Sequence, residues 1–364
     1  MKKVLVWLIA SVCAVVKGAV LFLKLYPGFG GRPDNADKEE YAKRAVNFSG
    51  EGFVYPAEYK LGGLTENVLI SGKGRRPEAE LPTAEPAIPD EPEADKVYIT
   101  WFGHSTVLVQ MHGLNLLFDP VYSRYSSPVQ FAGPERFSHP PVSLEELPEI
   151  DAVIITHDHY DHLDMNTVKQ LNGMGVRFIA PLGVDAHLER WGVPEENITA
   201  MTWWEETEIS GLTVACTPTK HYSGRLRLGS NETLFASWVL KDDIRQIFIC
   251  GDSGFGSHFE AIHEHYGDFD LVLMDGAQYN MAWHDSHMFP EESVMACGML
   301  GAGLAMPVHW GAFSLAPHAW DDPVTRFTAA AEKEGLETIT PMIGATVDLD
   351  DIAPHQQHWW EDIK

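Results

Sequence analysis

Apolar and polar residues follow different patterns in successive parts of the chain. Residues 4–23 form an almost continuous apolar run. Residues 25–76 are punctuated by glycine and asparagine without sustained periodicity, and residues 77–95 combine repeated prolines with acidic side chains. From residue 96 onward, short apolar runs alternate with turn residues. These patterns predict a hydrophobic N-terminal segment (1–24), an extended N-terminal arm with an acidic, Pro-rich stretch (25–95) and a folded domain (96–364).

The folded part begins with strands joined by turns and continues with strands that alternate with helices. The segments VYITWFGHSTVLVQM and LNLLFDP predict two strands joined by a turn at His112–Gly113. The short apolar run DAVIITH predicts a buried strand. Further strands are expected in VRFIAP, LTVACTP, FASWVLK, RQIFICGD and DLVLMDG, and helices in MNTVKQLNGM, EESVMACGMLGA and PVTRFTAAAEKEG. This order predicts an α/β domain with a large mixed sheet or two stacked sheets.

The N-terminal apolar run is long enough to cross a bilayer. A helix of about 20 residues spans about 30 Å, roughly the thickness of the hydrocarbon layer. Lys17 is unfavourable in mid-membrane, but near the end of a span its amine can reach the headgroups. We expect a retained membrane anchor at residues 4–23; a cleaved signal peptide and a buried helix stay open. Lys2 and Lys3 precede the run, which favours a cytoplasmic N-terminus and an extracytoplasmic catalytic domain, with the cytoplasmic face as the alternative.

Composition narrows the classes of function. The 364 residues are 45% hydrophobic and 21% charged, which suits a globular protein and excludes a mainly disordered, collagen-like or multi-span membrane protein. The 26 basic and 52 acidic residues give a net charge of −26, which argues against nucleic acid as a partner. The four cysteines are widely spaced and form no CxxC pair, so they predict neither a zinc ribbon nor a thioredoxin-like motif.

The strongest chemical signal is the segment THDHYDHLD at residues 156–164, directly after the predicted strand DAVIIT. Loops that follow buried strands carry the chemistry of many α/β folds. Three imidazoles and several carboxylates in one loop would be costly to bury unpaired, and metal coordination resolves that cost. The spacing of His157 and His159 suits two ligands of one ion, and the pair Asp161–His162 suits a second ion.

Four segments resemble, in the same order, the signature of the metallo-β-lactamase-fold hydrolases. They are HxHxDH at 157–162, PTKH at 218–221, GDSG at 251–254 and PVHWG at 307–311. The resemblance implies an αββα sandwich of two mixed sheets flanked by helices. It also implies two zinc ions, with iron or manganese as alternatives in one or both positions. In the implied site His157, His159 and His221 bind one ion, Asp161, His162 and His309 bind the other, and Asp252 bridges both.

A closer similarity points to one branch of this family. The segments TWFGHSTVLVQ, FDPVYSRYSSP, PTKHYSGR, GDSGFG and HMFPEES are similar to the N-acylphosphatidylethanolamine-hydrolysing phospholipase D branch and its bacterial relatives. This similarity implies a phosphodiesterase that cleaves N-acylphosphatidylethanolamine, or a related phospholipid, through a hydroxide shared by the two ions. Asp161 and Asp252 would be catalytic as ligands, His104 would lie near the site, and His287 would contact a phosphate or protonate a leaving group. No GxSxG nucleophile motif occurs.

Several roles stay open at this stage. Asp119 and Asp164 are candidates to orient metal-bound imidazoles, but they equally fit a turn residue and a helix N-cap. Tyr160 is expected to pack rather than to react, and the Trp203–Trp204 pair to lie in the core.

Other functions compete with the phospholipase. The same metal site could open a lactone or cleave a small phosphate ester. A binding protein without turnover is disfavoured because all seven implied ligands are present, and a redox enzyme of the same fold is disfavoured because no flavodoxin-like extension follows residue 364. A homo-oligomer stays open.

Overall fold

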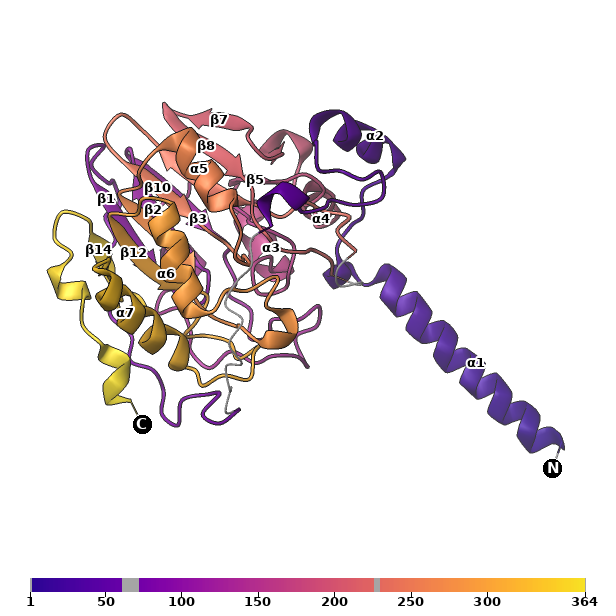
Figure 1. Cartoon of the computed structure of the whole chain (residues 1–364). Coiled ribbons are helices and arrows are strands. Elements are labelled where there is room, and N and C mark those ends of the chain that lie inside the picture. Colours follow the sequence, from indigo (N-terminus) through magenta and orange to yellow (C-terminus); the bar gives the residue numbers. More distant parts are fainter. Residues whose placement is uncertain (1, 61–71, 226–229, 364) are drawn as a thin grey trace.

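The structure is a computed structural model that describes residues 2–60, 72–225 and 230–363. Two seven-stranded sheets face each other, and helices cover both outer faces (Figure 1). This arrangement confirms the predicted αββα sandwich of two mixed sheets.

The first sheet has the strand order β14-β1-β2-β3-β4-β5-β6. Neighbours from β14 to β3 pair antiparallel, and those from β3 to β6 pair parallel. Helices α3 (Met165–Gly173) and α4 (Asp185–Arg190) contribute to the apolar cluster on its outer face. The strands are β1 (Val97–Trp101), β2 (Val107–Met111), β3 (Leu114–Phe118), β4 (Ala152–Ile154), β5 (Arg177–Pro181), β6 (Ile198–Met201) and β14 (Thr346–Asp348).

One strand prediction in this sheet was wrong. The segment 97–111 is not a single strand, because the chain reverses between β1 and β2. Gly103 and His104 adopt positive φ angles of 89° and 55° at this reversal. Three polar residues, His104, Ser105 and Thr106, interrupt the apolar run at this turn, but their side chains are buried as in a strand. The predicted turn at His112–Gly113 is confirmed, with φ angles of 56° and 75°.

The second sheet has the strand order β13-β12-β11-β10-β9-β8-β7. It is antiparallel from β7 to β10 and parallel from β10 to β13. Helices α5 (His258–Tyr266), α6 (Pro290–Met299) and α7 (Asp322–Glu334) contribute to the cluster on its outer face. The strands are β7 (Glu206–Ile209), β8 (Leu212–Thr217), β9 (Ser237–Lys241), β10 (Gln246–Ile249), β11 (Leu271–Asp275), β12 (Leu304–Val308) and β13 (Glu337–Thr338).

The main core lies between the two sheets. Alternate residues such as Val109 and Val214 point into it, whereas their neighbours Leu108 and Ala215 pack under the outer helices. Both faces of each central strand are therefore buried, which explains why these strands are continuous apolar runs. Trp203 contributes to the same core, as expected from the sequence.

The N-terminal region contains two helices. Helix α1 (Lys2–Leu25) projects away from the body (Figure 1). Its segment Trp7–Leu25 is long and apolar enough to cross a membrane, with a mean hydropathy of 2.1, and a signal sequence would pass the same test. Helix α2 (Asn35–Arg44) lies within the arm that the sequence predicted to be extended, and a capping box formed by Asp34 and Asp37 begins it. The boundaries between the three predicted regions stay predictions.

Short 3-10 helices complete the described chain. They are η1 (Pro27–Phe29), η2 (Ala57–Tyr59), η3 (Leu144–Glu146), η4 (Glu195–Asn197), η5 (Met281–Trp283), η6 (Ala353–His355) and η7 (Trp359–Asp362).

Candidate metal centre

The chemistry-bearing residues follow the ends of four strands. The metal loop, defined here as residues 156–164, follows β4; His221 follows β8, Asp252 follows β10, and His309 follows β12. Strand β4 belongs to the first sheet, whereas β8, β10 and β12 belong to the second. The site therefore forms where the two sheets meet.

One group of donors gathers three imidazoles and a carboxylate. His157 Nε2 lies 2.9 Å from His159 Nδ1, and His221 Nε2 lies 3.2 Å from the same atom. Asp252 Oδ2 lies 3.7 Å from His157 Nε2 and 3.6 Å from His221 Nε2. A neutral imidazole has only one N–H, so these converging nitrogens cannot all satisfy one another. A cation bound between them would.

A second group lies beside the first. Asp161 Oδ2 lies 3.5 Å from His162 Nε2 and 3.3 Å from His309 Nε2. Asp252 Oδ1 approaches His162 Nε2 to 3.1 Å, so the carboxylate of Asp252 offers one oxygen to each group. His104 joins this second group, with Nε2 at 2.9 Å from Asp161 Oδ2.

An independent observation indicates that these donors fit divalent cations. His162 Nε2 and Asp252 Oδ1 are buried and make no hydrogen bond with the described residues, although they face each other. Buried polar atoms without a partner are rare and costly. Imidazole nitrogen and carboxylate oxygen are common ligands of zinc and of related transition metals, so a cation held by these two atoms removes the cost.

The protonation states also suit a metal. Burial lowers the pKa of His157 and of His221 well below the usual value, so both imidazoles are neutral, which is the form that binds a cation. Burial alone would raise the pKa of Asp252, but the surrounding imidazoles, above all His162, hold it well below the usual range. Burial would lower the pKa of His309, yet Asp252 and Asp275 overcome it and raise that pKa to about 10. The carboxylates thus hold a proton on His309, and a metal ion would replace that proton as the positive charge between them.

Two carboxylates hold metal-site imidazoles from behind. Asp119 Oδ2 lies 2.7 Å from His162 Nδ1, and Thr156 donates to both oxygens of the same carboxylate. Asp275 lies 3.1 Å from His309 Nδ1 through one oxygen and 3.3 Å from His287 Nδ1 through the other. Such contacts fix the tautomer and the orientation of a ligand.

Asp275 is the residue that sequence reasoning missed. It ends β11 and precedes Gly276, and Asp252 likewise adjoins a glycine, Gly251, after the end of β10. The parallel pairing of β10, β11 and β12 brings their carboxyl ends side by side. The repeated pattern of an apolar strand, an aspartate and a glycine was the available signal.

The structure also decides among the open roles. Asp164 caps α3 and accepts hydrogen bonds from Asn166, Thr167 and Ser123, so it does not orient an imidazole. Tyr160 donates its hydroxyl to the carbonyl of Arg225 and packs against the guanidinium of that residue, as the sequence predicted for a packing role.

Arg225 ties the metal loop to the base of α1. Its Nη1 donates to the carbonyls of Asp158 and Leu163, at 2.8 Å each, and its Nη2 donates to the carbonyl of Gly28 at 3.1 Å. The guanidinium also lies over the ring of Trp191, whose indole N–H donates to the carbonyl of Pro27. Nothing in the sequence pattern had indicated this contact, because every acceptor is a backbone carbonyl.

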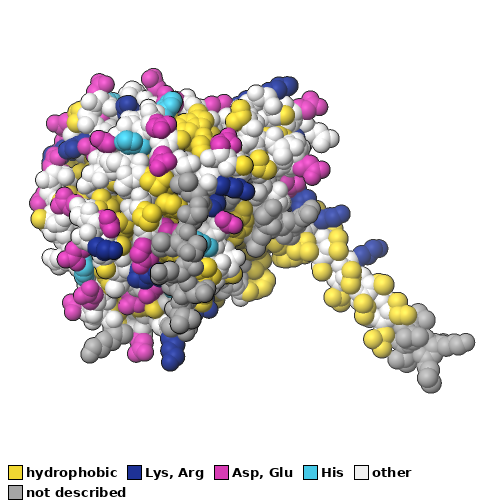
Figure 2. Space-filling view, viewed as in Figure 1, with side chains coloured by type: hydrophobic (Ala, Val, Ile, Leu, Met, Phe, Trp, Pro, Cys, Tyr) yellow, Lys and Arg dark blue, Asp and Glu magenta, His cyan; other side chains and the backbone are white. Residues whose placement is uncertain are grey.

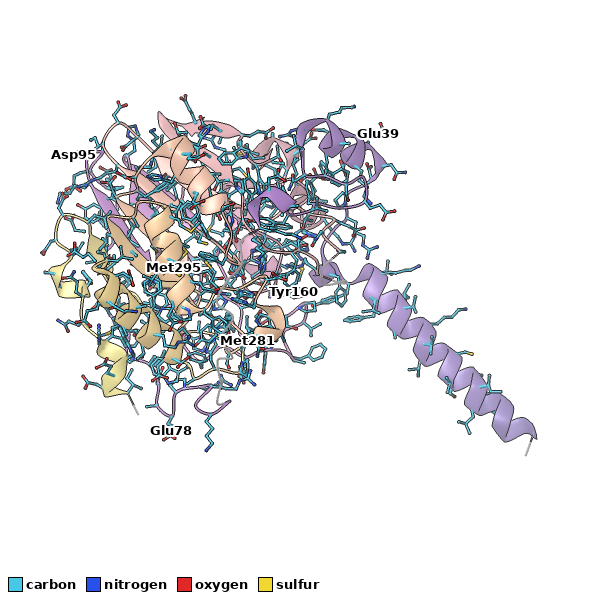
Figure 3. All side chains as sticks on the ribbon, viewed as in Figure 1. Glu39, Glu78, Asp95, Tyr160, Met281 and Met295 are labelled. Carbon is cyan, nitrogen blue, oxygen red and sulfur yellow. The ribbon has the colours of Figure 1, made fainter. Side chains whose placement is uncertain are left out.

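A cavity of about 300 Å³ opens onto the donors. Asp161, Asp252, His287 and His309 line its floor, whereas His104 does not line it. Its lining is partly apolar through Trp283, and Trp283 and Met281 of η5 are exposed hydrophobic side chains. The labelled residues Tyr160 and Met281 lie on the side of the body from which α1 departs (Figure 3). The remaining lining residues are Ser126, Pro134, His159, Tyr160, Tyr222, Gln278 and Leu315.

Comparison with known proteins agrees with this site. The Beta-lactamase superfamily domain matches residues 114–310, a stretch that contains all seven predicted ligands. The chain belongs to this superfamily. Fold, family and donor groups together define it as a metallo-hydrolase that uses divalent metal.

Individual relatives refine the comparison. An uncharacterized protein of Mycobacterium tuberculosis is 45% identical over 290 residues, which cover 78% of this chain and 77% of that protein. The N-acyl-phosphatidylethanolamine-hydrolyzing phospholipase D 1 of Caenorhabditis elegans is 32% identical over 231 residues, covering 60% of this chain and 65% of the relative. The solved structure of Igni18, a metallo hydrolase from Ignicoccus hospitalis, superposes with a TM-score of 0.54 at 21% identity, covering 70% of this chain and 98% of Igni18. The predicted resemblance to this branch is therefore confirmed, and the structural neighbour supports the fold.

Proposed function

We propose that this chain is a zinc-dependent phosphodiesterase of phospholipase D type that hydrolyses N-acylphosphatidylethanolamine or a related phospholipid. One observation carries the proposal: donors for two cations line a cavity that is partly apolar and that lies beside the exposed hydrophobic side chains of η5. Paired cations suit the in-line displacement at a phosphodiester. Exposed hydrophobic side chains beside the cavity suit a substrate with acyl chains. The named activity of the Caenorhabditis elegans relative points in the same direction.

In this proposal the seven predicted ligands keep their roles. When bound, the two cations supply a water molecule of lowered pKa and offset the charge that develops on the phosphoryl oxygens. The chain supplies the geometry around them, because Asp119 and Asp275 hold His162 and His309 in place. One cation would be held by His157, His159 and His221, the other by Asp161, His162 and His309, with Asp252 between them.

His287 is positioned to act on the substrate. Its Nδ1 faces Asp275, and its Nε2 lies 3.9 Å from Asp252 Oδ2 at the cavity floor. We assign it the contact with a phosphate oxygen or the transfer of a proton to the departing alkoxide. His104 is a positioning residue here, because it touches Asp161 and does not reach the cavity.

The proposal places the enzyme at a membrane. Helix α1 would be a retained anchor through residues 4–23, with the catalytic domain on the extracytoplasmic face; the cytoplasmic face is the alternative. An anchor would keep the cavity close to its lipid substrate. Helix α1 is predominantly apolar in surface, in contrast to the mixed surface of the body (Figure 2).

The test uses the purified full chain, loaded with zinc, in detergent micelles. N-acylphosphatidylethanolamine is offered, and release of phosphatidic acid and N-acylethanolamine is followed beside a chelator-treated sample. We expect release that depends on metal and is lost in Asp252→Asn. No release from protein shown by metal analysis to hold two ions would refute the lipid assignment, and lactones and small phosphodiesters would be tried next.

A matched pair of variants separates a lipid from a small substrate. Met281→Ser with Trp283→Ser removes apolar side chains of η5 without touching a donor. We expect slower hydrolysis of vesicle-bound lipid and little change with a soluble aryl phosphodiester. Met174→Ser and Ile244→Ser, two exposed hydrophobic positions that do not line the cavity, serve as the control.

A further inference from the structure

A second hollow, here called the junction groove, lies where α1 meets the body. It encloses about 470 Å³ and shares no lining residue with the cavity at the metal centre. Val20 and Leu23 of α1 supply an apolar wall, and Lys24, Arg32 and Arg190 supply three cationic side chains. An apolar wall next to several positive charges is the combination that an amphipathic anion requires.

The cations in the junction groove are poorly neutralised. Neither Lys24 nor Arg190 has a carboxylate within 4.0 Å among the residues that the structure describes. Arg190 instead donates to the carbonyl of Leu25 at 3.0 Å. Within the described part of the chain, the one carboxylate near Arg32 is that of Glu232, at 3.8 Å. The chain as a whole carries a net charge of −26, and dark-blue Lys and Arg side chains are visible near the place where the apolar helix joins the body (Figure 2).

The walls of the junction groove are fixed by close packing. A Cβ atom on Gly30 would lie 2.1 Å from His187 Nδ1, and one on Gly31 would lie 1.8 Å from the carbonyl oxygen of Ala186. Only glycine allows the chain to approach α4 this closely. Arg190 at the end of α4 donates to the carbonyl of Leu25, and Trp191, which follows α4, donates to the carbonyl of Pro27. These two hydrogen bonds hold the C-terminal end of α1 against α4. The groove is therefore preformed in this structure.

The position of the junction groove selects its ligand. It lies at the C-terminal end of the segment Trp7–Leu25, where a membrane-spanning helix would leave the hydrocarbon layer. Headgroup phosphates of a bilayer lie at this level, with their acyl chains alongside the helix. We propose that the junction groove binds the headgroup phosphate of an anionic phospholipid, whose acyl chains lie along Val20 and Leu23. The bound lipid is held and not hydrolysed, and it seats the catalytic domain on the membrane in one orientation.

This inference rests on the membrane location of α1 in the proposed function, but not on the reaction at the metal centre. The test therefore measures binding and needs no turnover. The full chain in neutral detergent micelles is titrated with dioctanoyl-phosphatidylglycerol, and bound lipid is counted by native mass spectrometry. Dioctanoyl-phosphatidylcholine is titrated in parallel. We expect one saturable phosphatidylglycerol site per chain and weaker binding of phosphatidylcholine.

Variants locate the site. Replacing Lys24, Arg32 and Arg190 together by glutamine is expected to weaken phosphatidylglycerol binding roughly 100-fold, since each cation near a membrane surface contributes about fivefold. Lys24→Gln with Arg32→Gln, which leaves the Arg190 bond to the helix base intact, is expected to weaken it roughly 20-fold. The control replaces three exposed cations elsewhere on the body by glutamine and should bind like the wild type; these are Lys169, Arg177 and Lys333.

Several results would overturn the proposal. They are unchanged affinity in both groove variants, no saturable site in the wild type, and equal binding of the two lipids. Inorganic phosphate that displaces phosphatidylglycerol with the same affinity as the lipid would also overturn the proposal, because the acyl chains would then contribute nothing to binding. Loss of binding in Asp252→Asn would place the lipid at the metal centre instead, whereas loss of hydrolysis with lipid binding retained would leave this inference standing.

Discussion

Arg225 offers the sharpest test of how the metal loop is held. Its guanidinium is buried and donates to three backbone carbonyls, two of which belong to the metal loop. The replacement Arg225→Met keeps an unbranched side chain of similar length and removes every donor. The carbonyls of Asp158, Leu163 and Gly28 then lose this partner in a buried place.

The expected cost follows from these contacts. Each buried carbonyl left without its donor costs about 1 kcal/mol or more, so the three together destabilise the folded protein by about 3–5 kcal/mol. The metal loop also carries four predicted ligands, His157, His159, Asp161 and His162. Removal of a group that orients ligands typically lowers metal affinity roughly 10–100-fold. We therefore expect Arg225→Met to lose both stability and metal affinity.

Arg136 provides a matched control. It is also buried, it donates to the carbonyls of Val121 and Ser138, and its guanidinium lies over the ring of Phe313. None of these acceptors lies in the metal loop. Arg136→Met should therefore lower the free energy of unfolding to a similar extent while leaving metal affinity almost unchanged.

The assay separates the two effects. Urea unfolding of metal-free protein gives the stability of each variant, and competition with a chelator of known affinity gives the affinity for zinc. Hydrogen exchange of the amides in the metal loop reports the local opening. If Arg225→Met and Arg136→Met lose metal affinity equally, the guanidinium of Arg225 does not position the loop and the reasoning is refuted.

The remaining predictions concern one contact, one titration and the metal itself. Asp275→Asn is expected to lower the affinity for zinc roughly 10–100-fold, because the carboxylate of Asp275 holds both His309 and His287. Competition with a chelator measures this affinity, and an unchanged value would contradict the role. Burial raises the pKa of Asp185 to about 6 from 3.8, so its contribution to stability is complete below about pH 4 and is lost as pH rises through about 6. In the wild type, this titration should lower the free energy of unfolding by about 2–3 kcal/mol between about pH 4 and 7, and the fall should be absent in Asp185→Asn. Urea unfolding at several pH values measures it, and identical pH profiles for the two proteins would contradict the prediction. Removal of metal by a chelator should lower the midpoint of thermal unfolding, because the cations bind to the folded protein and not to the unfolded chain. Calorimetry compares samples with and without metal, and equal midpoints would exclude a stabilising role of the metal.

The sequence predicted the ligand-bearing loops well because each follows a buried strand. The apolar runs before His157, His221 and Asp252 end where the polar residues begin, and in the structure β4, β8 and β10 precede them. A strand buried on both faces has a continuous apolar sequence, so its end is visible without knowledge of its partners. The prediction failed at Gly103–His104, where the polar residues His104, Ser105 and Thr106 interrupt the apolar run but are buried together with it in the structure.

The residues that escaped prediction act through partners distant in sequence. Asp275 stands 34 residues before His309, and only the parallel register of β11 and β12 brings them together. Arg225 contacts backbone carbonyls, which every residue possesses, so no side-chain pattern marks its acceptors. Spacing along the chain reveals donors that share a loop, whereas the groups that hold those donors in place depend on strand order.

Backbone strain at the site leads to the same conclusion. His104, Asp119, Gln278 and His309 all adopt positive φ angles, a conformation that costs a non-glycine residue about 1–3 kcal/mol when the surroundings enforce it. His104 and His309 support each other, because His309 donates its N–H to the carbonyl of His104 and His104 donates its own to the carbonyl of Trp310. These two bonds join the β1–β2 turn of one sheet to the end of β12 in the other. Strain of this kind persists only while both sheets are packed together, so the donors of the metal centre acquire their geometry from the closure of the sandwich and not from the loops alone.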